Sequence, residues 1–322
     1  MSRLAWTLAA RSFVTVALAA TLPAHALTIV PTFGSGVSLA AQTAFNYVAG
    51  EFAALYSDPV TVNIQVNAGN TGLGGSSTSL QFVSPSTYAQ VRTALIADQT
   101  AHPSTNGATS VNAGGSVNSA VDPTGGAVFL YTFAQAKALG ARPANDAAID
   151  GTFTYNSTLA YTFDPNNRGT GGFDFIGVTE HEVSEIMGRI TLNGANLTGS
   201  PNYLPFDLFN FSGTGAHSLG TGPGRYFSVN NGTTNLHGYN DAVANGGDSQ
   251  DWDSSVLTSP YTAFTSANQA HALNSASDIA TLDVIGWDLI VAVPEPGTVA
   301  LMLAGLAAVG TVVRRRVATN LG

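Results

Sequence analysis

The chain contains no cysteine, and this absence limits how its fold can be held together. A disulfide framework and a cysteine-ligated zinc site are both excluded. The fold must therefore rest on a packed core, and a segment of about 265 residues is long enough to bury one. Only 10% of the residues are charged, where about 25% is usual, so long surface helices rich in Glu and Lys are not expected.

The N-terminus reads as a secretory signal peptide over residues 1–26. Arg3 and Arg11 supply the positive start, an apolar run follows over 13–22, and Ala24-His25-Ala26 fits a small-x-small cleavage site. An N-terminal membrane helix is the alternative, but it requires a longer apolar run. The mature chain is therefore expected outside the cytoplasm.

The C-terminus carries a second processing pattern. Pro294-Glu295-Pro296 precedes an apolar stretch that ends before Arg314-Arg315-Arg316. This tripartite pattern resembles the PEP-CTERM sorting signal, here over 293–316. The resemblance implies that an exosortase removes the tail and that the protein reaches the cell surface or the medium. The apolar stretch predicts a transmembrane segment before processing, with a cytoplasmic tail at 317–322, and a plain membrane anchor is the alternative.

The segment between these signals, residues 27–292, is expected to form one acidic domain. It holds six Lys or Arg residues against 19 acidic residues. This balance favours cation binding and argues against nucleic acid as a partner.

The apolar periodicity of this domain predicts an α+β fold with a twisted sheet, an early packing helix and a second, more strongly patterned helix. Trp252 and Trp287 are expected in the core. The expected elements are strands at 27–33, 60–66 and 128–132, helices at 37–56, 85–99, 133–139, 173–189 and 275–287, and a hairpin at 148–163.

Glutamate is scarce in this domain, yet three of its four glutamates fall within six residues, next to a histidine, in Glu180-His181-Glu182-Val183-Ser184-Glu185. On a helix, His181 and Glu185 project from the same face. Glu182 is adjacent to His181, turned by about 100° around the helix axis. Two ligands one turn apart with a glutamate between them is the arrangement of a zinc-peptidase helix.

The match to H-E-x-x-H is incomplete because Glu185 stands where the second histidine would be. A carboxylate can bind zinc. One histidine with two carboxylates nevertheless leaves the site near zero charge, which should raise the pKa of a bound water and favour harder metals such as Mn²⁺ or Ca²⁺. The substitution therefore either retunes the site or marks a lost activity.

The segment around His181 resembles the active-site helix of metzincin-like secreted metalloproteases. It is more similar still to zinc metalloproteases that carry a PEP-CTERM tail and an H-E-[VI]-[ST]-E-[IV]-M-G-R helix. Further similar segments are Leu73–Ser77, Asp207-Leu208-Phe209 and Leu282–Trp287. The resemblance implies a metzincin-like core, with His181 and Glu185 as zinc ligands and Glu182 as catalytic base.

The sequence pattern does not identify the third metal ligand. A metzincin places it six residues after the second ligand, where this chain has Thr191, and the core has no methionine after Met187. Asp207 is the first choice, because a lone carboxylate in an apolar stretch needs a partner. A role as cap or turn former is the equal alternative for Asp207, and the weaker candidates are His217 and His237.

Other polar residues have simpler expected roles. Glu180 is expected on the surface, and His102 and His271 in solvent. Three aspartates, Asp248, Asp251 and Asp253, resemble a Ca²⁺-binding loop in composition but not in EF-hand spacing.

Three functions follow as hypotheses. The first is a secreted or cell-surface zinc-dependent endopeptidase that acts on protein or peptide substrates. The second is a catalytically inactive surface or matrix protein on a metalloprotease-like scaffold. The third is a Ca²⁺-stabilised adhesive domain.

Overall fold

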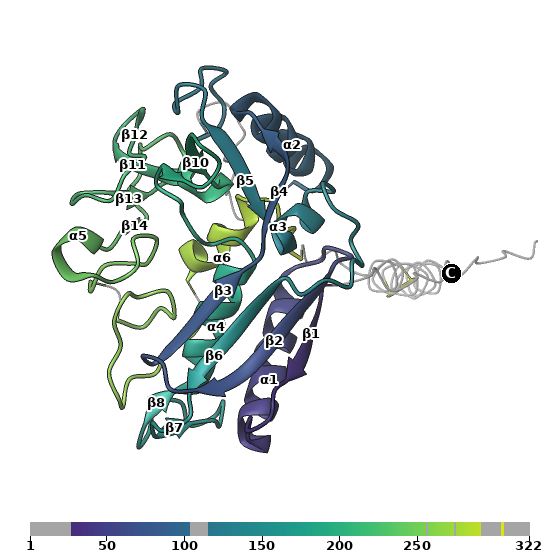
Figure 1. Cartoon of the computed structure of the whole chain (residues 1–322), viewed down its shortest axis with the longest axis vertical. Coiled ribbons are helices and arrows are strands. Elements are labelled where there is room, and N and C mark those ends of the chain that lie inside the picture. The colour runs from purple at the N-terminus through teal and green to yellow at the C-terminus, as the bar shows by residue number, and fades with distance from the viewer. Residues whose placement is uncertain (1–26, 104–114, 256, 274, 291–303, 306–322) are drawn as a thin grey trace, which may run out of the picture.

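The computed structural model describes residues 27–103, 115–255, 257–273, 275–290 and 304–305. Helices and strands are mixed along this part of the chain, so the predicted α+β class is confirmed (Figure 1). The predicted signal peptide and cytoplasmic tail, and the sorting signal apart from 304–305, lie outside the described residues. None of the helices in the described part has the length and apolar character of a membrane span.

The main sheet has four strands in the order β1 (Thr28–Phe33), β2 (Thr61–Gly69), β6 (Gly151–Asn156) and β3 (Gly74–Thr78). The first three are parallel, and β3 is antiparallel to β6. In β2 the apolar side chains are buried and the residues between them half-buried, as the alternation of the sequence predicts.

Two helices pack on one face of this sheet, α1 (Leu39–Leu55) and α4 (Phe175–Ile186) (Figure 1). Helix α1 starts at Ser38, whose Oγ accepts the N–H of Ala41 at 3.2 Å. Three of its apolar residues at helical spacing, Phe45, Val48 and Phe52, are fully buried. The predicted packing helix is therefore present, and it contacts α4 directly.

The remaining elements form smaller sheets and short helices around this unit. One further sheet has the strand order β4 (Leu80–Ser86), β5 (Val128–Thr132), β10 (Pro201–Tyr203), β9 (Ala195–Asn196). Another has the order β12 (Ala216–His217), β11 (Asn210–Gly213), β13 (Tyr226–Phe227), β14 (His237–Gly238), and β7 (Tyr161–Thr162) pairs with β8 (Phe173–Asp174). The other helices are α2 (Tyr88–Ala101), α3 (Phe133–Ala138), the 3₁₀ helix η1 (Pro205–Phe209), α5 (Ala242–Asn245) and α6 (Ala276–Asp283).

The predicted hairpin at 148–163 is wrong. Strand β6 lies inside the main sheet between β2 and β3, and β7 pairs with β8 instead of β6. Helix α4 and strand β3 approach β6 closely at Gly151, where a Cβ would lie 2.6 Å from Ile186 Cγ1 and 2.7 Å from the carbonyl oxygen of Ser77. Only glycine lets the helix and the neighbouring strand come this near.

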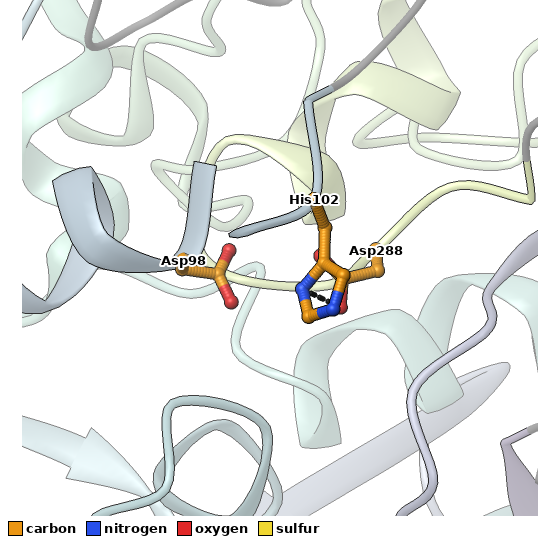
Figure 2. A group of neighbouring side chains, drawn as sticks. All are labelled: Asp98, His102 and Asp288. Carbon is orange, nitrogen blue, oxygen red and sulfur yellow. Dashed lines mark ion pairs between the residues drawn. The ribbon is translucent and has the colours of Figure 1, made fainter. Parts of the chain in front are cut away.

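Carboxyl groups gather where α2 ends and the domain approaches its C-terminal segment (Figure 2). His102 Nδ1 lies 2.7 Å from Asp288 Oδ2, and Asp98 faces the same point from α2. Asp58 accepts the N–H of Asp288 at 2.8 Å. Burial, and then the charge of Asp288, raise the pKa of Asp58 to about 8 and that of Asp98 to about 7. Burial raises the pKa of Asp288 to about 6, with His102 opposing.

These raised pKa values predict that the contribution of this carboxyl cluster to stability falls as the pH rises. The ordinary pKa of these carboxyls is 3.8, so their contribution is fully present below about pH 4 and is lost as the pH rises towards about 8. Asp98→Asn should therefore raise the melting temperature by a few degrees at pH 8 and leave it unchanged at pH 4.

The matched control is Asp164→Asn, which removes an exposed carboxylate. It should have no effect at either pH. Equal effects of Asp98→Asn at pH 4 and pH 8 would contradict the assignment.

Candidate metal centre

Helix α4 brings two of the predicted ligands together. It begins at Asp174, whose Oδ1 accepts the N–H groups of Ile176 and Gly177. It is terminated at Gly188, whose φ of +121° favours glycine. His181 and Glu185 are one turn apart on this helix, and His181 Nε2 lies 3.4 Å from Glu185 Oε1.

A third side chain of ligand type comes from the loop that follows α5. Asp251 Oδ1 lies 3.4 Å from His181 Nε2. One ligand atom from each of His181, Glu185 and Asp251 lies within 4.8 Å of the other two. The side chains are 14%, 7% and 4% exposed, so the cluster is largely removed from solvent while the imidazole keeps some access.

A hydrogen bond to the backbone fixes the orientation of the His181 imidazole. His181 Nδ1 lies 2.8 Å from the carbonyl oxygen of Pro260. Because a carbonyl oxygen only accepts hydrogen bonds, Nδ1 carries the proton and donates it. This contact aims Nε2 at the two carboxylates, as in metal sites where a backbone carbonyl orients the histidine.

Neighbouring side chains also hold the Glu185 carboxylate. Ser76, on β3, donates its Oγ–H to Glu185 Oε2 at 2.7 Å. Gln250 donates from Nε2 to Glu185 Oε1 at 2.9 Å. Helix α4, the edge strand of the main sheet and the 246–253 loop thus meet at one carboxylate.

The charges of the cluster favour a cation at His181 Nε2. Burial lowers the pKa of His181, but the negative charges of Asp251 and Glu185 outweigh it and raise the pKa to about 10. Burial raises the pKa of Glu185, but His181 and Arg189 outweigh it and hold the pKa at about 2. The carboxylates that attract a proton to Nε2 would equally attract a metal ion, which binds with release of that proton.

Two of the donor-to-donor distances match those of tetrahedral zinc coordination. Tetrahedral zinc, with N and O ligands at about 2.0–2.2 Å, holds its ligand atoms about 3.3–3.5 Å apart. His181 Nε2 lies 3.4 Å from Glu185 Oε1 and 3.4 Å from Asp251 Oδ1. One anchored imidazole and two carboxylates also form a donor set that manganese accepts.

A pocket of about 460 Å³ opens onto the cluster. His181, Asp251 and Glu182 line it together with apolar wall residues that include Leu73, Val178, Pro260 and Phe264. Burial, and then the charge of Glu185, raise the pKa of Glu182 to about 8. A carboxyl group with a pKa near neutrality beside a candidate metal centre is suited to proton transfer.

Strand β3 runs close to this wall because of Gly74. A Cβ at this position would lie 2.6 Å from Val178 Cγ1 and 3.4 Å from Glu182 Oε1. Glycine therefore sets how near the sheet edge lies to the pocket.

The structure does not bring Asp207 to this cluster, so its prediction as third ligand is corrected. Asp207 is fully buried and both of its oxygens accept backbone N–H groups: from Leu192 at 3.0 Å, Asn193 at 2.9 Å and Leu204 at 2.7 Å. The carboxylate has found its partners in the backbone, which is the turn-forming alternative. Among the described residues, Asp251 takes the place that the sequence assigned to Asp207.

Two other expectations are also wrong. Glu180 is fully buried and forms a bidentate ion pair with Arg168, whose two Nη atoms donate to the Glu180 oxygens at 3.1 and 2.9 Å. His271 is buried and lines the pocket. By contrast, His102 is exposed as expected.

The remaining candidates lie elsewhere. His217 and His237 pack against the rings of Phe211 and Trp252. Of the three aspartates in the predicted calcium loop, only Asp251 belongs to a ligand group in the described part of the chain.

Replacing Asp207 separates its structural role from that of a ligand. Asp207→Asn should lower the free energy of unfolding by about 2–3 kcal/mol, because an amide nitrogen would face N–H donors. When zinc is supplied, the purified variant should take up as much of it as the wild type. A stable Asp207→Asn variant that takes up less zinc than the wild type would show that Asp207 is a ligand after all.

Comparison with known proteins identifies the C-terminal segment. Residues 292–316 match the PEP-CTERM protein-sorting motif. A search of curated proteins and a search of solved structures gave no match. The motif implies processing by an exosortase, and it marks proteins that are exported and sorted to the cell surface or the extracellular space. The predicted sorting signal and location are therefore confirmed.

Proposed function

We propose that this exported protein is a zinc-dependent endopeptidase with a metzincin-like core. The observation that carries the proposal is the meeting of His181, Glu185 and Asp251 within 4.8 Å, beside a pocket that Glu182 also lines. The spacing of the donor atoms suits zinc, and the pocket gives a substrate access to the imidazole.

The proposed roles follow from these positions. His181, Glu185 and Asp251 would hold the zinc ion, which would supply Lewis-acid activation of the scissile carbonyl and of water. Glu182 takes the proton of the attacking water on its carboxylate and passes it to the leaving amine. Pro260 keeps the proton of His181 on Nδ1, and Ser76 keeps the Glu185 carboxylate from rotating.

The chemistry of the pocket favours a peptide substrate. Its wall is apolar along Leu73, Val178 and Phe264, whereas Asp248 and Asp251 line it with carboxylates. An apolar side chain can lie on the wall while its own peptide bond faces the acidic cluster.

An inactive surface or matrix protein on this scaffold is the second candidate. The observation that favours it is the residue at the expected third-ligand position, Thr191. Its Oγ1 accepts a hydrogen bond from Asn193 Nδ2 at 2.7 Å. On this alternative the cluster holds the fold together or binds a metal without turnover. A calcium-stabilised adhesive domain predicts stabilisation by Ca²⁺ instead of zinc.

The experiment uses the exported protein purified from cells, with labelled casein as an unstructured protein substrate. Glu182→Gln should keep about one zinc per chain and lose at least about 100-fold in hydrolysis, because it removes the proton acceptor but no ligand. His181→Ala should lose both zinc and hydrolysis. Asp253→Asn is the matched control, since it changes an aspartate of the same loop outside the cluster, and it should keep both.

The alternatives give different results. Zinc in the wild type without hydrolysis of casein would support the inactive scaffold. A wild type that takes up no zinc, even when zinc is supplied, would overturn the proposed function.

A further inference from the structure

Arg189 is a buried guanidinium in contact with both carboxylates of the candidate metal centre. Its Nη1 lies 3.0 Å from Asp251 Oδ1 and its Nη2 lies 3.6 Å from Glu185 Oε1. These are the same two oxygen atoms that lie 3.4 Å from His181 Nε2. The guanidinium and any metal ion bound at the imidazole would therefore interact with the same two carboxylate oxygens.

The guanidinium is fixed in this position. Its side chain is 0% exposed, and Nε donates to Ser184 Oγ at 2.7 Å. The guanidinium carbon lies 4.2 Å from the centre of the Tyr261 ring. The hydrogen bond on one side and the ring face on the other hold the guanidinium beside the two carboxylates.

Counting charges shows what Arg189 adds. With a neutral imidazole, the two carboxylates cancel a divalent ion and leave the ligand set without net charge. Arg189 brings the buried group to +1, which is the charge of a zinc ion held by two histidines and one glutamate, a known catalytic set. We propose that Arg189 is a positioning residue that neutralises Glu185 and Asp251 in the metal-free protein and supplies the positive charge that a second histidine would have preserved.

This inference rests on the proposed function, and its consequences for metal binding have a definite sign. Without Arg189, the buried carboxylates of Glu185 and Asp251 lose a cationic partner that lies 3.6 and 3.0 Å away, so the metal-free protein is destabilised. The bound ion is also no longer repelled by a fixed positive charge a few ångströms away, so the metal-bound protein is stabilised. Both effects tighten zinc binding.

The test compares the affinity of the exported protein for zinc alone, measured by competition with a chelator, in three variants. Arg189→Met should bind zinc at least about tenfold more tightly than the wild type, and zinc should raise its melting temperature more. Arg189→Lys keeps the charge and should stay within about threefold of the wild type. Arg189→Gln removes the charge and repeats the measurement if Arg189→Met does not fold.

Arg168→Met is the matched control. Arg168 is also a largely buried arginine that contacts two carboxylates, Asp174 and Glu180, but it contacts no residue of the cluster. This variant should melt at a lower temperature with and without zinc, and its zinc affinity should equal that of the wild type.

Two results would overturn the inference. One is unchanged or weaker zinc binding in the neutral Arg189 variants, which is expected if Arg189 serves packing alone. The other is equal tightening in Arg189→Lys and Arg189→Met, which would show that charge is not the cause. A wild type that binds no zinc would instead refute the proposed function, so the two failures are distinguishable.

Discussion

Burying charge is the constraint on which the rest of this structure depends. Helix α4 lies in the interior, yet its sequence carries one histidine and three glutamates, and Arg189 lies three residues after its end. Each buried charge needs a partner, because an isolated one costs several kcal/mol. Glu180 is neutralised by Arg168 on one side of the helix, and Glu185 by His181 and Arg189 on the other.

The fold serves this constraint by bringing distant segments to α4. Strand β3 contributes Ser76 from the edge of the main sheet, where Gly74 permits a close approach. The segment after α4, which carries β9 to β14 and α5, returns with Gln250 and Asp251, and the carbonyl oxygen of Pro260 contacts the far side of the imidazole. The resulting site is polar at its centre and apolar along its rim, which is the usual form of a ligand pocket.

Local patterns predicted much of this arrangement. The four-residue spacing of His181 and Glu185 predicted their meeting, because helical geometry alone determines it. The alternation in β2, the packing helix α1 and the burial of Trp252 and Trp287 followed from apolar periodicity in the same way.

Long-range pairing could not be predicted. Asp207 and Asp251 both stand next to large apolar residues, and nothing local distinguishes a carboxylate that binds backbone N–H groups from one that faces a histidine. Glu180 appeared to be a surface residue because its partner, Arg168, lies in a loop outside the helix. Strand β6 was assigned to a hairpin because its parallel pairing with β2 depends on residues far apart in the chain.

The most direct test of the central claim is a crystal structure of the exported protein with zinc, recorded on both sides of the zinc absorption edge. The account predicts one anomalous peak bonded to His181 Nε2, Glu185 and Asp251, with Glu182 close by but not bonded. The absence of a peak there, or a single peak at Asp98, His102 and Asp288 instead, would contradict it.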